Sequence, residues 1–190
     1  MEMKRGEKFL TEPFFFDNDC IAAFLWINEQ SLLAQLYPGR IIIPKPVYDE
    51  LSFPGVTHLK KRIDQMISSG QAEIRYIDAG SPTYDMYYAM TQEPENGHKI
   101  IGDGEAACLA LAKSENGIVA SNNLKDISTY IKELSLAHIT TGEILVEALH
   151  RGLITEEQGN TLWAEMLKKR RKLGASSFSE FLTLCCSASI

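Results

Sequence analysis

Short apolar runs alternate with longer helical patterns along the chain. Runs rich in β-branched or aromatic residues predict strands at 13–16, 40–43, 73–77, 117–120 and 136–140. Helical spacing of apolar residues predicts helices at 20–30, 31–36, 46–51, 56–69, 83–90, 104–114, 124–134 and 141–151. Such alternation implies right-handed crossovers and a sheet buried on both faces. We predict an α/β fold, a three-layer α/β/α sandwich around a mainly parallel sheet of about five strands.

The C-terminal part of the chain is entirely helical in pattern. One amphipathic stretch covers 155–172 and a shorter one covers 177–184. No internal repeat or long linker separates these stretches from the rest. We therefore expect residues 1–155 to form the main domain and residues 156–190 to form a helical extension packed on that domain.

Composition narrows the classes of protein. The segment from Met1 to Lys8 is charged, and no run approaches the roughly 20 apolar residues of a membrane span, so we expect a cytoplasmic protein without membrane contact. Four cysteines without CxxC spacing indicate neither a zinc site nor a disulfide framework. The net charge of −6 argues against capture of nucleic acid by the overall field. The basic run at 168–172 is interpreted as a solvated helix end.

Acidic and amide residues gather where apolar runs give way to helices. Taken singly, each is explained as a helix cap or a first-turn acid. Together they follow several strands whose carboxyl ends form one edge of a parallel sheet, where ligands bind. Oxygen ligands without His or Cys select Mg²⁺ or Mn²⁺. The residues concerned are Asp17, Asp19, Glu50, Asp103, Glu105, Asn122, Asn123 and Asp126.

The same segments carry a family resemblance. The series "FFFDND", "IIIPKPVYDELS", "GDGEAACLALA", "GIVASNNLKD" and "LAHITTGEILVEALHRGLIT" resembles PIN-domain proteins, with a tail like the C-terminal extension of one branch. These proteins are metal-dependent ribonucleases and include VapC-like toxins of toxin–antitoxin pairs. The resemblance implies hydrolysis of RNA phosphodiesters with Mg²⁺ or Mn²⁺. It also implies a small antitoxin protein as a partner.

The resemblance assigns roles residue by residue. Asp17, Glu50 and Glu105 match the first three acids of the family, which hold the metal. The fourth acid falls in "SNN", where this chain has Asn122 and Asn123 in place of aspartate. We expect Asn123 to occupy the fourth catalytic position. The residues expected to restore the missing charge or to support the site are Asp103, Asp126, Asp19, Asn122, Thr140 and Thr141.

Three alternatives stay open at this point. The asparagine pair is compatible with a PIN-like module that binds or regulates but does not cleave. "FFFDND" and "IIGDGEAA" also resemble motifs of haloacid-dehalogenase-type phosphatases, in which the first Asp is a nucleophile, although the order of the motifs is wrong. "GDGEAA" fits the dinucleotide pattern GxGxxA, but two carboxylates in that turn would repel a pyrophosphate.

Apolar residues are unusually dense between positions 24 and 33. They are too many for a single stripe facing the core, so we expect part of this region to form an interface in a homodimer or with an antitoxin. The residues are Phe24, Leu25, Trp26, Ile27, Leu32 and Leu33.

Overall fold

The computed structural model describes residues 11–94 and 97–187, so the segment from Met1 to Lys8 lies outside the described residues. Strands and helices alternate as expected until the helical C-terminal part. The elements are β1 (Phe14–Phe16), α1 (Asn18–Ile27), α2 (Gln30–Leu36), β2 (Ile41–Pro44), α3 (Lys45–Glu50), α4 (Thr57–Ser68), β3 (Ala72–Arg75), α5 (Pro82–Thr91), α6 (Asp103–Glu115), β4 (Ile118–Ala120), α7 (Leu124–Leu134), β5 (Ala137–Ile139), α8 (Thr141–His150), α9 (Glu156–Lys168) and α10 (Phe178–Ser187).

The strands form one five-stranded sheet in the order β3-β2-β1-β4-β5. Every neighbouring pair is parallel. The central strand β1 pairs with β2 through Phe15 and Ile42 and with β4 through Phe15 and Val119. Its phenylalanines are buried because helices cover both faces of the sheet. The predicted α/β fold is confirmed.

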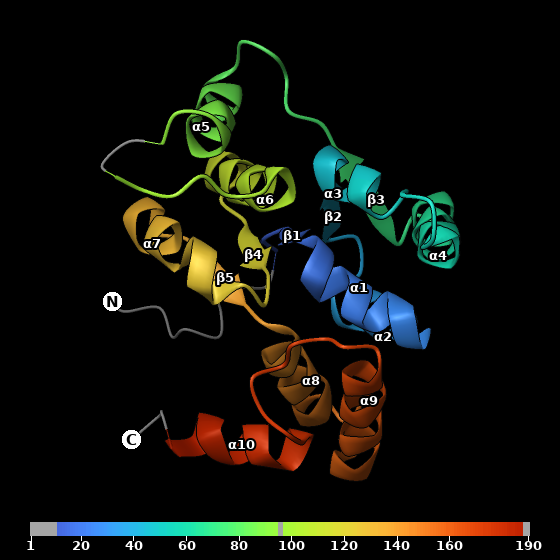
Figure 1. Cartoon of the computed structure of the whole chain (residues 1–190). Coiled ribbons are helices and arrows are strands. Elements are labelled where there is room, and N and C mark those ends of the chain that lie inside the picture. The colour runs from blue at the N-terminus through green and yellow to red at the C-terminus, as the bar shows by residue number, and fades with distance from the viewer. Residues whose placement is uncertain (1–10, 95–96, 188–190) are drawn as a thin grey trace.

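Two helical layers enclose the sheet. Helices α5, α6 and α7 pack together on one face, and α1, α2, α4 and α8 lie on the other (Figure 1). The sequence of α6 is apolar nearly all round because α6 contacts the sheet, α3, α5 and α7 at once. This packing fixes the N-terminus of α6 beside the carboxyl ends of the central strands.

The C-terminal helices pack directly on the sandwich. Helix α9 contacts α1 and α8, and α10 contacts α8 and α9. A Cβ atom on Gly159 would lie 2.3 Å from the Phe178 ring, and one on Gly142 would lie 2.4 Å from the Phe181 ring. These two glycines therefore let α10 approach closely. The division of the chain after residue 155 stays a prediction.

The apolar residues of α1 and α2 are covered within the molecule. Phe24, Leu25, Leu32 and Leu33 are buried. Trp26 is partly buried, with His58 of α4 at its edge and the Lys169 ammonium 5.6 Å from its ring centroid. The expectation of a surplus apolar face in this region was wrong because α4 and α9 pack against it.

Helix α9 ends earlier than its pattern predicts. The predicted helix continued to residue 172, whereas α9 ends at Lys168 and Arg170 has a left-handed φ of 59°. Two hydrogen bonds close the helix end, from Arg170 N to Leu167 O at 2.8 Å and from Arg171 N to Met166 O at 3.1 Å. The basic run thus leaves the helix and turns. No helix in the described ranges is long and apolar enough to cross a membrane.

Candidate functional site

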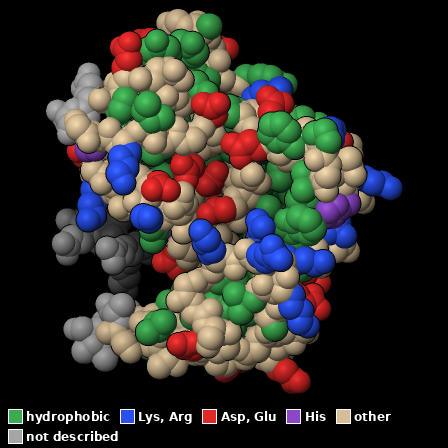
Figure 2. All heavy atoms as spheres, viewed as in Figure 1, with side chains coloured by type: hydrophobic (Ala, Val, Ile, Leu, Met, Phe, Trp, Pro, Cys, Tyr) green, Lys and Arg blue, Asp and Glu red, His purple; other side chains and the backbone are tan. Residues whose placement is uncertain are grey.

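The acidic segments meet at one edge of the sheet. Asp17 follows β1 directly, Asn122 follows β4 after one residue, and Glu50 ends the short helix after β2. Because these three strands are adjacent and parallel, their carboxyl ends lie side by side. The N-terminus of α6 adds Glu105. Figure 2 shows acidic side chains gathered in the middle of this face, and a cavity of about 570 Å³ opens there.

Asp17 is the most deeply buried carboxylate of the site, with 5% of its surface exposed. Its Oδ1 accepts a hydrogen bond from the Asn18 N–H at 2.7 Å and caps α1. Its Oδ2 accepts a hydrogen bond from the Ser121 hydroxyl at 3.0 Å. Burial raises the pKa of Asp17 well above its usual value, and the charges of Asp19 and Glu105 raise it further. The ionised carboxylate therefore lacks a compensating positive charge.

Glu50 reaches the site through a gap left by glycine. Its Oε2 accepts a hydrogen bond from the Asn18 side-chain amide at 2.8 Å. A Cβ on Gly104 would lie 2.8 Å from Glu50 Oε1 and 3.4 Å from Asp17 Oδ1. Burial raises the pKa of Glu50, while hydrogen bonds from Asn18 and from the Gly104 backbone oppose that rise. Gly104 therefore brings these two carboxylates to the N-terminus of α6.

Glu105 and Asp126 share one amide group. The Asn123 Nδ2 donates to Glu105 Oε1 at 2.5 Å and to Asp126 Oδ2 at 2.7 Å. The other Glu105 oxygen accepts from the Gly102 N–H at 3.2 Å. Burial raises the pKa of Glu105, and the bond from Asn123 acts against that rise. An aspartate at position 123 would instead repel both carboxylates.

Asn122 fixes the loop after β4. Its backbone N–H donates to Asp19 Oδ1 at 3.1 Å, and its side-chain amide donates to the Thr141 hydroxyl at 2.9 Å. Its Oδ1 accepts from the Thr141 N–H at 2.9 Å. Burial raises the pKa of Asp19. Asn122 therefore joins β4, α1 and α8, and its amide is already engaged with Thr141.

Seven of the residues expected at the site line the cavity: Asp17, Asp19, Glu50, Glu105, Asn122, Asn123 and Asp126. Asp103, Thr140 and Thr141 are not among the lining residues. Asp103 forms a hydrogen bond with the Tyr87 hydroxyl, Thr140 caps α8 and Thr141 is buried. The convergence of the acids agrees with expectation, while their roles as ligands stay predictions.

Sequence reasoning missed several residues of the site. Asn18 and Ser121 bind the Glu50 and Asp17 carboxylates, respectively, and each lies next to a recognised motif residue. The cavity is also lined by Lys125, Arg170, Arg171 and Lys172. The interpretation of the basic run as a solvated helix end was wrong for its last three residues, because the chain turns back at Arg170. A dense basic run in an acidic chain was the available signal.

The donor set fits a hard divalent cation. Burial raises the pKa of Asp17, Asp19, Glu50 and Glu105, so a cation placed among them would relieve the cost of ionisation. Oxygen donors alone favour Mg²⁺ or Mn²⁺ over zinc. Among the described residues, no three His, Cys, Asp or Glu side chains are arranged to hold an ion as they stand. The Asn18 and Asn123 amides instead occupy the Glu50 and Glu105 oxygens that would bind the ion.

Together, the fold and the site define an α/β protein with acidic side chains converging at the carboxyl edge of a parallel sheet. Residues 14–186 match the family model DUF3368, described as PIN domain. The chain therefore belongs to the PIN-domain family, and the match extends from β1 into α10.

A solved structure with a related fold is that of VapBC2 from Rickettsia felis bound to a DNA fragment from its promoter. It has a TM-score of 0.47 and 20% sequence identity, and the alignment covers 67% of this chain and 97% of that chain. No curated protein matches the chain.

Proposed function

We propose that this protein is an Mg²⁺- or Mn²⁺-dependent ribonuclease that hydrolyses RNA phosphodiesters. The observation that carries the proposal is the convergence of Asp17, Glu50 and Glu105 on one cavity from three separate parts of the chain. Membership of the PIN-domain family supports it, and it argues against the dehalogenase-type phosphatase.

In this proposal Asp17, Glu50 and Glu105 hold the cation, with Asn123 and Asp126 at the fourth position. A bound Mg²⁺ or Mn²⁺ supplies the activation of water and the stabilisation of charge on the leaving oxygen. Asn18 and Ser121 orient the Glu50 and Asp17 carboxylates through the hydrogen bonds described above.

Cleavage of a mixed RNA substrate, measured against Mg²⁺ and Mn²⁺ concentration, tests the proposal. We expect Glu50→Gln to reduce the rate at least about a hundredfold, because the cation loses one charged ligand. The matched control is Asp49→Asn, since Asp49 is exposed, pairs with Lys45 and does not line the cavity. Equal rates for the wild type and Glu50→Gln would refute the metal-dependent mechanism.

A second candidate is a PIN-like module that binds RNA without cleaving it. The observation in its favour is the Asn123 amide, which satisfies Glu105 and Asp126 without a cation. If the wild type cleaves no RNA with either metal while Asn123→Asp does, the native chain is this binding module.

We further propose that a small antitoxin protein restrains the activity, because free cleavage of RNA would harm the cell. Growth arrest on expression, relieved by co-expression of the product of a neighbouring gene, would support this role. Unchanged growth on expression of a protein that cleaves RNA in vitro would contradict it. The homodimer also stays a proposal, and sedimentation of the purified protein tests it.

A further inference from the structure

The segment after α9 carries a row of positive charges to the acidic cavity. We call residues 169–172 the basic turn; they are Lys169, Arg170, Arg171 and Lys172. The left-handed φ of Arg170 ends the helix and redirects the chain. A non-glycine residue in this conformation costs about 1 kcal/mol, so the turn is held by its surroundings.

Contacts on both sides fix the basic turn. Before it, Trp163 of α9 is fully buried and donates its Nε1–H to Ala175 O, beyond the turn, at 3.1 Å. Leu173 follows the turn and is buried. The Lys169 ammonium lies over the ring of Trp26. The turn is therefore fixed relative to α1, the helix that Asp17 caps.

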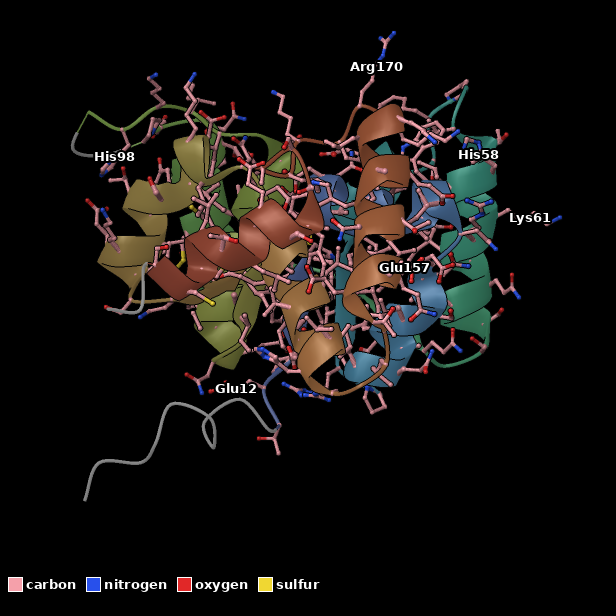
Figure 3. The ribbon with its side chains drawn as sticks, turned by 90° about the horizontal axis from the view of Figure 1, so that it is seen from below. Glu12, His58, Lys61, His98, Glu157 and Arg170 are labelled. Atoms are coloured by element: carbon pink, nitrogen blue, oxygen red, sulfur yellow. The ribbon has the colours of Figure 1, made fainter. Side chains whose placement is uncertain are left out.

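Three side chains of the basic turn face the acids across the cavity. Arg170, Arg171 and Lys172 line it together with Lys125 of α7. The cavity is thus lined by five acidic and four basic side chains. In the view of Figure 2 basic side chains lie beside the central acidic group, and Figure 3 shows Arg170 projecting into solvent beyond the end of α9.

These cations are not consumed by ion pairs. No salt bridge to Arg170, Arg171 or Lys172 is formed within residues 11–94 and 97–187. The only electrostatic effect on an acid of the site comes from Arg171, which acts against the burial-driven rise in the pKa of Asp19. Their positive charges are therefore available to a ligand.

The charge arrangement suits a polyanion that must approach a negative site. The molecule carries a net charge of −6, so its overall field repels RNA. Phosphates next to the reacting one would meet the carboxylates of the cavity unless cations bind them first. Guanidinium groups bind phosphate oxygens in a bidentate manner, and lysine adds a mobile charge.

We propose that the basic turn binds the RNA phosphates next to the scissile phosphodiester, so that the C-terminal extension forms part of the substrate-binding site. This inference rests on the proposed ribonuclease function. The ligand is single-stranded RNA, because the turn offers charges for a backbone and a cavity of about 570 Å³ accommodates one extended strand.

Paired charge-removing variants test the inference. Arg170→Gln/Lys172→Gln removes two charges that line the cavity. Lys61→Gln/Lys168→Gln removes two exposed charges that do not, and Figure 3 shows Lys61 pointing into solvent from α4. Both pairs are placed in the Asp17→Asn background, in which the RNA is expected to stay intact. Binding of a fluorescein-labelled RNA of about twelve nucleotides is followed by anisotropy at several salt concentrations.

We expect the Arg170/Lys172 pair to weaken RNA binding about tenfold and to lower the salt slope by about 1.4, or about 0.7 for each phosphate released. The Lys61/Lys168 pair should leave the slope unchanged. In the otherwise wild-type protein, the first pair should raise KM and leave kcat largely intact. Lys172→Gln alone, which leaves the turn at Arg170 untouched, should lower the slope by about 0.7.

Equal losses in the two pairs would overturn the inference, because binding would then follow total charge alone. It would also be overturned if RNA binding were unchanged while Mn²⁺ bound more tightly to Arg170→Gln/Lys172→Gln, since the turn would then act on the cation site. RNA binding that depends on the turn, without any cleavage, would refute the proposed ribonuclease but support the inference. Cleavage that is indifferent to the turn would do the reverse.

Discussion

Asn123 places two amide protons between Glu105 and Asp126. Each bond is assisted by the charge of its acceptor, and such bonds are about twice as strong as neutral ones. The amide thereby does in part what a cation would do in the same place. Its chemistry couples the stability of the protein to the occupancy of the site.

Asn123→Asp is expected to have opposite effects with and without metal. In the presence of a chelator the variant should lose about 1–3 kcal/mol of unfolding free energy, because two hydrogen bonds become repulsions. With Mn²⁺ the added charge should tighten binding and lower the metal concentration needed for cleavage. Thermal unfolding with and without Mn²⁺ measures both effects. A variant less stable than the wild type even with saturating Mn²⁺ would contradict this account.

Asp17→Asn should stabilise the metal-free protein at neutral pH. The folded-state pKa of Asp17 is raised, so its ionisation costs stability above that pKa, and the cost disappears as the pH falls through it. Asparagine also caps helices well, so α1 should keep its cap. We expect a gain of about 1 kcal/mol, or roughly 2–4 °C in Tm.

The advantage of Asp17→Asn over the wild type should shrink on acidification, because protonation neutralises the native carboxyl. Unfolding curves recorded from neutral to acidic pH with a chelator measure it. A constant difference between the two proteins across this range would refute the assigned cause.

At the scale of elements, the start of α6 sets the spacing of the site. Glycine is usually a poor choice inside a helix, and alanine is preferred by about 1 kcal/mol. Here the missing Cβ leaves room for Glu50 and Asp17 against the first turn. The helix therefore gives up intrinsic stability for the close approach of two carboxylates.

Gly104→Ala should separate folding from function. We expect a Tm close to that of the wild type but at least about tenfold weaker Mn²⁺ binding, because the new Cβ would displace Glu50. Isothermal titration with Mn²⁺ measures the loss. Gly102→Ala is the comparison, since its Cβ would meet Glu105 at an ordinary 3.6 Å and should cause the smaller effect. Equal Mn²⁺ affinity in both variants would contradict the steric explanation.

The elements of the sheet were predictable from sequence because their signals are local. Apolar runs such as "FFF" and "III" fall in β1 and β2, and the acids follow them at the edge that parallel pairing dictates. The end of α9 was not predictable, because the basic run continues an amphipathic pattern and its turn depends on the contacts of Trp163 and Leu173. The bond from Asn18 to Glu50 joins residues 32 positions apart, which no local pattern reports.

At the scale of the whole molecule, α9 and α10 are part of the core. Trp163, Met166 and Phe178 are buried, and α9 contacts α1. The family match likewise extends over these helices. We therefore expect the extension and the sandwich to unfold together.

Trp163→Ala should destabilise the entire molecule by about 3–5 kcal/mol, because it leaves a large cavity between α9 and α10. Leu167→Ala on the same helix is the control; its side chain is 36% exposed and its loss should cost less than about 1 kcal/mol. Denaturant unfolding followed by far-UV circular dichroism measures both. Two separate transitions in either protein would show that the extension unfolds independently.

The asparagine amides of the site have a property that a carboxylate lacks, since one end of the group donates and the other accepts. In this structure the nitrogen ends of Asn18 and Asn123 face Glu50 and Glu105. Half a rotation about the last side-chain bond exchanges nitrogen for oxygen at the same point in space. Positions 18 and 123 therefore serve the empty and the occupied site with one rotamer change each, and the backbone around the site need not move between the two states.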